Sequence, residues 1–126
     1  MSSCEDNCER LEEIRMFSVY RYQQPEPGTS RTVRFEGRHF GSEVSLFVVD
    51  ADPGRGPALH VHPYAETWVV RKGEAEFTVG NDKTRGSAGD IIVGPANVPH
   101  RFENVGTDRL EIVCIHPSQT FEQTFV

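Results

Sequence analysis

The feature that most constrains the fold is a series of short segments of β-type residues that recurs from Thr32 onward. Each segment alternates apolar and polar side chains or is rich in β-branched and aromatic residues. Turn-forming residues separate the segments, as in the sequences ADPGRG and GND. The segments are Thr32–Glu36, Val44–Asp50, Leu59–His62, Glu66–Arg71, Ala75–Val79, Asp90–Val93, His100–Val105 and Leu110–His116. Short strands at this spacing are typical of a β-sandwich or barrel, and a set of this size in two sheets predicts an all-β jelly-roll barrel.

The first 31 residues have a different character. An acidic segment with apolar side chains at helical spacing predicts one short helix over residues 4–16, with its apolar face at Cys4, Cys8, Leu11 and Ile14. The alternating segment Phe17–Tyr22 and a proline-rich loop over Gln23–Ser30 follow it. We therefore expect one domain in two parts: a helix with a leading strand or loop over 1–31, and the barrel over 32–126.

Composition excludes several classes of function. The chain of 126 residues has 19 acidic and 13 basic residues, and its net charge of -6 would repel a phosphate backbone, so no nucleic-acid partner is expected. No apolar run is long enough to span a bilayer, and the acidic N-terminal sequence does not resemble a signal peptide. Three cysteines do not make a disulfide framework. These observations predict a cytoplasmic protein without a membrane partner.

Three of the five histidines fall in two short segments that are candidates for a metal site. On a strand, His60 and His62 point to the same face, because side chains alternate with a period of two. Pro63–Tyr64 indicates a bend, after which Glu66 begins the next strand and can return its carboxylate to the same point. His100 begins another strand after a turn that contains proline.

These two segments resemble the two signature motifs of the cupin superfamily. The first, GRGPALHVHPYAETWVVRKG, fits at every fixed position, whereas the second, GDIIVGPANVPHRFEN, has Asn97 where the family has glycine. Asparagine tolerates the left-handed conformation better than other non-glycine residues, so we expect the turn to survive. The resemblance covers residues 32–117 and implies a small single-domain cupin of the cupin-2 type, with a double-stranded β-helix. It also implies a set of metal ligands: His60, His62, Glu66 and His100.

The chemistry of this ligand set fits a divalent transition metal. Three neutral imidazoles and one carboxylate suit one ion of Fe, Mn, Ni, Cu or Zn, and the spacing does not choose among these metals. Four protein ligands leave one or two positions open on a five- or six-coordinate ion. Because one carboxylate only partly neutralises a divalent ion, the site should favour an anionic ligand such as an enolate, a catecholate or a carboxylate.

Strand parity predicts which side chains surround the site. Aromatic side chains are expected to form the wall of a substrate pocket: Trp68, Phe77, Phe102 and Phe47. The alternative is that these side chains are simply part of the hydrophobic core. His116 shares one face of the last long segment with Leu110, Ile112 and Cys114. If that face points inward, His116 lies at the rim of the pocket and is a candidate catalytic acid or base; the alternative is an exposed histidine at a strand end.

The resemblance implies a metalloenzyme, because the superfamily includes dioxygenases, isomerases, decarboxylases and cyclases. We expect a dioxygenase-type oxidoreductase that acts on a small anionic or enolisable molecule, with Glu66 as a general base. One alternative is an isomerase or cyclase in which the metal acts as a Lewis acid. Another is a non-catalytic barrel that binds a small molecule and uses the metal for stability. By the same resemblance, we expect a homodimer.

Overall fold

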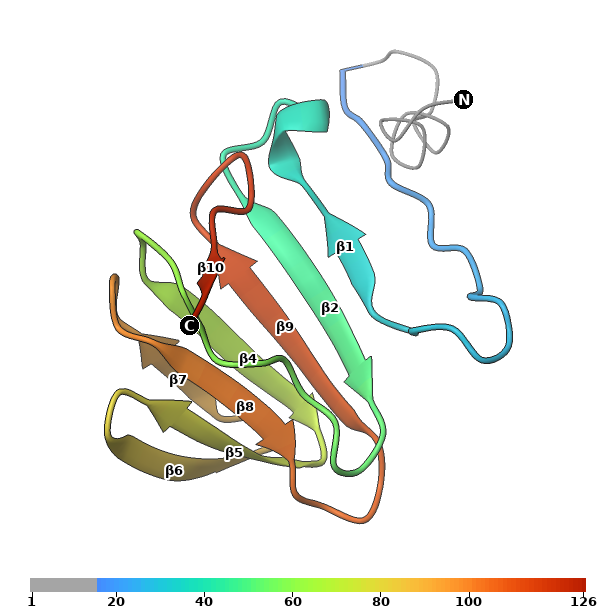
Figure 1. Cartoon of the computed structure of the whole chain (residues 1–126). Helices are drawn as coiled ribbons and strands as arrows, with labels where there is room; N and C mark the ends of the chain where they lie inside the picture. Colours follow the sequence, from blue (N-terminus) through green and yellow to red (C-terminus); the bar gives the residue numbers. More distant parts are fainter. Residues whose placement is uncertain (1–15) are drawn as a thin grey trace.

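The computed structural model describes residues 16–126, which form two five-stranded antiparallel sheets facing each other (Figure 1). One sheet has the order β1-β2-β9-β4-β7, and the other has the order β10-β3-β8-β5-β6. The elements are β1 (Val33–Phe35), a short 3-10 helix (Gly37–His39), β2 (Ser45–Ala51), β3 (His60–Val61), β4 (Glu66–Lys72), β5 (Glu74–Val79), β6 (Asp82–Ser87), β7 (Ile91–Gly94), β8 (His100–Asn104), β9 (Leu110–His116) and β10 (Thr124–Phe125). The predicted all-β jelly-roll architecture is therefore confirmed.

The eight predicted segments correspond to β1–β5 and β7–β9, with small differences at their ends. Two strands were not predicted. β6 is polar and almost wholly exposed, and it pairs only with β5, so neither its composition nor its burial marks it as a strand. β10 is a two-residue strand that exists through its pairing with β3.

The N-terminal predictions fall mostly beyond the part of the chain that the structure describes. Residues 4–15 of the predicted helix, including Cys4 and Cys8, lie outside the described residues. Tyr20, in the leading segment, forms an isolated β-bridge rather than a strand. Within residues 16–126, no helix has the length and hydropathy needed to cross a lipid bilayer.

The core follows the predicted alternation of strand side chains. Every second residue of β9 is buried, from Leu110 to His116, so this face does point inward. Trp68 on β4 and Phe77 on β5 are fully buried, and their rings pack with centroids 5.2 Å apart. Full burial of such side chains contributes on the order of 1.5–3 kcal/mol each. The buried faces of the two sheets thus form one core, and the site described below lies at its edge.

Asn97 adopts a φ of 63°, which confirms the left-handed conformation expected at this position. Its backbone N–H donates a hydrogen bond to the carbonyl oxygen of His62 at 2.8 Å. The turn before β8 therefore ties the second motif directly to the first.

Replacing Asn97 by glycine should change the free energy of unfolding by no more than about 1 kcal/mol, with either no change or a slight gain. Glycine adopts this φ without strain, although it also increases the entropy of the unfolded chain. The main-chain hydrogen bond to His62 is retained. Thermal unfolding followed by circular dichroism measures the effect, and a large loss of stability would assign a role to the exposed asparagine side chain.

Candidate metal centre

The four residues predicted as metal ligands come together from three strands and one connecting segment. His60 on β3 is the direct cross-strand neighbour of His100 on β8, Glu66 begins β4, and His62 lies in the segment between β3 and β4. We call these four side chains the His-Glu cluster. All four are buried, and their donor atoms lie within 4.8 Å of one another.

Backbone carbonyl groups fix the orientation of the three imidazole rings. Each Nδ1 atom lies within hydrogen-bond distance of a carbonyl oxygen: 2.7 Å for His60 and Ala58, 2.9 Å for His62 and Glu122, and 3.1 Å for His100 and Val98. Because a carbonyl oxygen only accepts, each Nδ1 carries a proton and donates it. In the neutral ring, the Nε2 atom then keeps a lone pair, as a metal ligand requires.

The distances within the cluster fit a bound cation. Oε1 of Glu66 lies 2.9 Å from Nε2 of His62 and 3.1 Å from Nε2 of His100. Lone pairs of neutral imidazoles that face a carboxylate oxygen repel it unless a proton or a metal ion lies between them. Two donors at right angles around an ion, each at about 2.1 Å, are separated by about 3.0 Å. This donor set therefore could hold a divalent metal ion.

The electrostatics of the cluster favour the ionised form of Glu66. Burial alone would raise the pKa of this carboxyl, but its close contacts with the imidazole groups of His100, His116 and His62 outweigh burial and hold the pKa well below its usual range. Burial lowers the pKa of His60, which keeps this ring neutral. Burial also disfavours charge on His62, but its hydrogen bond to Glu66 outweighs this effect and raises its pKa. A proton and a metal ion therefore compete for Nε2 of His62.

His116, a predicted acid or base, lies directly beside the cluster. It is 1% exposed, and its Nε2 atom is 3.2 Å from Oε2 of Glu66, at an angle that gives an ion-pair contact rather than a well-aligned hydrogen bond. Its Nδ1 atom lies 2.6 Å from the hydroxyl oxygen of Tyr64. Burial raises the pKa of Tyr64 to about 12, so this phenol stays protonated and can donate to Nδ1. The remaining ring proton of a neutral His116 then faces Glu66.

Sequence reasoning did not identify Tyr64 as a site residue. The sequence predicts only a bend at this residue, but in the structure its ring stacks on His62 at an angle of 7°. Its partner His116 lies 52 residues further along the chain, and only the tertiary pairing of β4 with β9 brings the two together. No local pattern could have revealed this contact.

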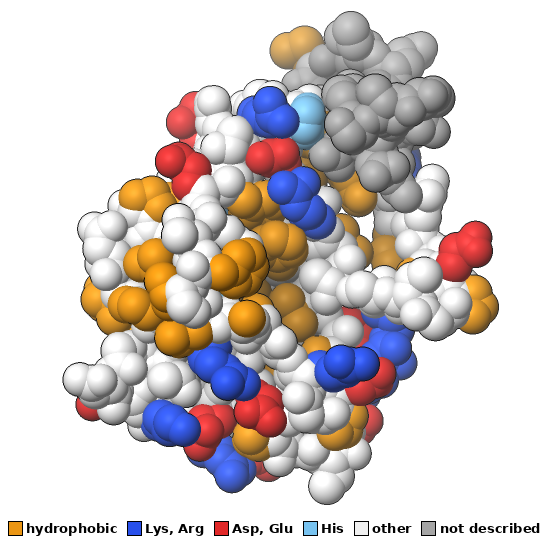
Figure 2. Space-filling view, in the orientation of Figure 1, with side chains coloured by type: hydrophobic (Ala, Val, Ile, Leu, Met, Phe, Trp, Pro, Cys, Tyr) orange, Lys and Arg blue, Asp and Glu red, His pale blue; other side chains and the backbone are white. Residues whose placement is uncertain are grey.

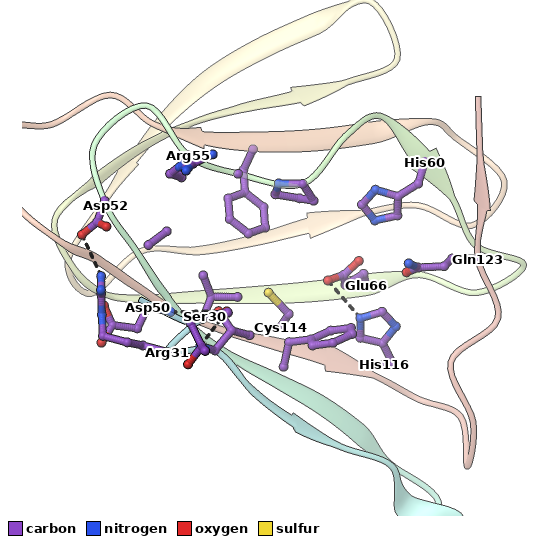
Figure 3. A pocket seen from close by; sticks show the side chains of 18 of the residues that line it. Ser30, Arg31, Asp50, Asp52, Arg55, His60, Glu66, Cys114, His116 and Gln123 are labelled. Atoms are coloured by element: carbon purple, nitrogen blue, oxygen red, sulfur yellow. Dashed lines mark hydrogen bonds and ion pairs between the residues drawn. The ribbon is translucent and has the colours of Figure 1, made fainter. Parts of the chain in front are cut away.

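A cavity of about 620 Å³ adjoins the cluster (Figure 3). His60, Glu66 and His116 line one end of it, together with Gln123. Of the aromatic residues predicted to wall the pocket, Phe47 and Phe102 line the cavity. The structure places Trp68 and Phe77 in the fully buried core, and they are not among the lining residues. The volume is within the range of sites for organic ligands.

The C-terminal segment completes the surroundings of the cluster. The carbonyl oxygen of Glu122 orients His62, and the neighbouring Gln123 lines the cavity. Phe125 pairs with His60 across β10 and β3, and their ring centroids are 5.8 Å apart. These contacts were not predicted, because the segment carries no motif and is positioned entirely by long-range pairing.

Deleting residues 122–126 should weaken metal binding about 10- to 100-fold, because groups that orient a ligating histidine typically contribute this much. The deletion removes the carbonyl that holds Nδ1 of His62. Isothermal titration of the metal-free protein with Zn(II) measures the affinity. Phe125→Ala is the matched control, since it removes an apolar side chain but leaves this carbonyl in place; equal losses in both variants would contradict the role of Glu122.

Comparisons with known proteins agree with this geometry. The sequence model of the cupin domain family matches residues 47–116, more than half of the chain. An uncharacterized protein of Methanocaldococcus jannaschii is 31% identical over 86 residues, which cover 67% of this chain and 69% of that protein.

Among solved structures, an oxalate decarboxylase of Bacillus subtilis with Mn(II) centres matches with a TM-score of 0.70 and 23% identity, over 82% of this chain and 30% of that one. An oxalate oxidase matches with a TM-score of 0.68 and 25% identity, over 83% of this chain and 59% of that one. This chain thus corresponds to only part of either enzyme, and these likenesses establish the fold. Taken with the domain match, they show that the chain belongs to the cupin family.

Proposed function

We propose that this chain is a metal-dependent enzyme of the dioxygenase type, acting on a small anionic or enolisable organic molecule. It would hold one divalent transition metal ion through His60, His62, Glu66 and His100. The observation that carries the proposal is the convergence of imidazole and carboxylate lone pairs at one end of a cavity of about 620 Å³. Two residues of the cluster, His60 and Glu66, line this cavity. A ligand in the cavity could therefore reach a cation that the cluster holds.

Each side chain at this end of the cavity has a distinct task in the proposal. When bound, a redox-active metal would supply a positive centre for an anionic substrate and the means to react with dioxygen. Phe47 and Phe102 provide an apolar wall that restricts water. Glu66 and His116 are the proposed proton-handling pair, because Oε2 and Nε2 lie 3.2 Å apart beside the same cavity. Tyr64 positions His116 through its hydroxyl group.

The solved structures support redox chemistry on a small anion without fixing the reaction. Both are named for oxalate, a two-carbon dicarboxylate, and the Bacillus subtilis enzyme contains Mn(II) centres. Manganese is therefore one candidate for this chain. The donor set of three imidazoles and one carboxylate suits Fe, Ni, Cu or Zn as well.

The test begins with the metal content of the purified protein, measured by mass spectrometry, followed by reconstitution with each of the five metals. Metal-dependent oxygen consumption with a panel of β-diketones, catechols, flavonols and oxalate is the expected result. Turnover without oxygen uptake would instead favour an isomerase or cyclase in which the metal acts as a Lewis acid. Absence of turnover, with a melting temperature that rises with metal, would favour a non-catalytic binding protein.

We further propose that the chain acts as a homodimer in the cytoplasm. Apolar side chains gather on the side of the molecule where β10 and the C-terminus lie (Figure 2), and Phe125 and Val126 there are 61% and 67% exposed. Exposed apolar patches often mark contacts between proteins. Light scattering coupled to size-exclusion chromatography should give twice the mass of the chain, whereas a monomeric mass at micromolar concentration would contradict the dimer.

A further inference from the structure

The cavity beside the His-Glu cluster has a second polar end. Figure 3 shows His60, Glu66, His116 and Gln123 toward one end, and Arg31, Asp52 and Arg55 toward the other. Cys114 lies between these ends, and the lining also includes the apolar residues Phe47, Val49 and Phe102. The cavity thus combines two separate polar ends with apolar lining.

Most of the charges at the second end are paired within the protein. Arg31 contacts Asp52 at 2.7 Å and Asp50 at 3.3 Å. Nε of Arg109 donates to the same Asp50 at 2.9 Å. Arg55 differs from these arginines, because its guanidinium makes no ion pair or hydrogen bond with any residue in the part of the chain that the structure describes.

The backbone around Arg55 is nevertheless firmly held. Its N–H donates to the carbonyl of Asp52 at 3.1 Å, and its carbonyl accepts from the N–H of Asn104 at 2.8 Å. The next residue, Gly56, packs so closely on β8 that an added Cβ would lie 1.9 Å from the carbonyl oxygen of Phe102. The backbone therefore holds Arg55 at a fixed position on the cavity wall, and its exposed, unpaired side chain extends from there.

The separation of the two ends limits the length of a ligand that reaches both. Arg55 and His60 are five residues apart, so their Cα atoms cannot be more than about 18 Å apart. The cavity volume of about 620 Å³ is far more than a two-carbon dicarboxylate occupies. A longer molecule with an apolar body matches both the volume and the lining.

We propose that the ligand of this cavity carries two anionic groups on an apolar body, one at the His-Glu cluster and the other a carboxylate bound by Arg55. The inference rests on the proposed metal centre, because the first group is assigned to it. A planar guanidinium binds a carboxylate through two parallel hydrogen bonds. Asp50 and Asp52 at the same end disfavour a doubly charged phosphate more than a singly charged carboxylate.

The test compares two probes on the zinc-loaded protein: 3,4-dihydroxyphenylpropionate and its methyl amide, which share a catechol but differ in tail charge. Titration calorimetry should show that the wild-type protein binds the acid about tenfold more tightly than the amide. Arg55→Gln should abolish this difference without changing the affinity for the amide. Arg55→Lys should retain part of the preference. Arg71→Gln is the matched control, because Arg71 is exposed like Arg55 but is not among the residues that line the cavity.

Zinc content, measured on the same samples, separates this inference from the proposed function. Three results would each overturn the inference while leaving the metal centre intact. The wild-type protein could bind acid and amide with equal affinity, Arg55→Gln could weaken the binding of both probes equally, or a zinc-loaded protein could bind neither probe. Absence of zinc from the wild-type protein would overturn the proposed function, and the inference with it.

Discussion

Replacing His62 by alanine should weaken metal binding by at least about 100-fold, since loss of a group that merely orients a ligand already costs 10- to 100-fold. The side chain is 1% exposed, and its Nε2 atom lies 2.9 Å from Oε1 of Glu66. The substitution removes one of four donors and leaves the carboxylate with fewer partners. Titration with Zn(II) and mass spectrometry of the bound metal both measure the effect.

The matched control is His39→Ala. His39 lies in the 3-10 helix and its Nε2 atom is 3.7 Å from Glu36, outside the His-Glu cluster. This variant should bind metal like the wild type. Near-normal metal content in His62→Ala would contradict the ligand assignment, and equal losses in both variants would indicate a general effect on folding.

Replacing Trp68 by alanine should cost about 3–5 kcal/mol in the free energy of unfolding, the range for a large aromatic residue removed from a core. The side chain is fully buried and fills the space above Gly94, where an added Cβ would meet the indole ring at 2.5 Å. Its ring also packs edge-on against His100, with centroids 5.0 Å apart. Metal affinity should therefore fall along with stability.

Trp68→Phe is the informative companion variant. The buried Nε1 atom of Trp68 has no hydrogen-bond partner within residues 16–126, so a phenyl ring removes an unsatisfied donor and keeps an aromatic contact. We expect this variant to lose less than half as much stability as Trp68→Ala. Chemical denaturation followed by circular dichroism measures both, and equal losses would show that the indole nitrogen has a partner.

The fold could be predicted from sequence because it depends on local periodicity, whereas the full set of metal ligands was predicted because the two segments resemble the cupin motifs. Alternation within β8 places Phe102 and Asn104 on the same buried face as His100. On β9, alternation grouped His116 with Leu110, Ile112 and Cys114 but left the direction of this face open, and the structure shows that it points inward. The left-handed conformation of Asn97 followed from the residue type that stands at a position where the family has glycine.

Features that depend on contacts between distant segments could not be predicted from the sequence. β6 forms by pairing with the edge of β5, and its sequence DKTRGS has only one residue, Thr84, that is typical of a strand. The carbonyl of Glu122 reaches His62 only because β10 pairs with β3. Trp68 and Phe77 face inward, as the alternation of side chains along a strand predicted. Alternation cannot, however, distinguish residues of the packed core from residues that line the cavity.

The central claim is that three imidazoles and one carboxylate bind the same ion, and anomalous diffraction from crystals grown with Zn(II) or Mn(II) tests it most directly. We expect one strong peak about 2.0–2.3 Å from Nε2 of His60, His62 and His100 and from Oε1 of Glu66. A metal peak elsewhere, with these four donor atoms turned away from one another, would contradict it.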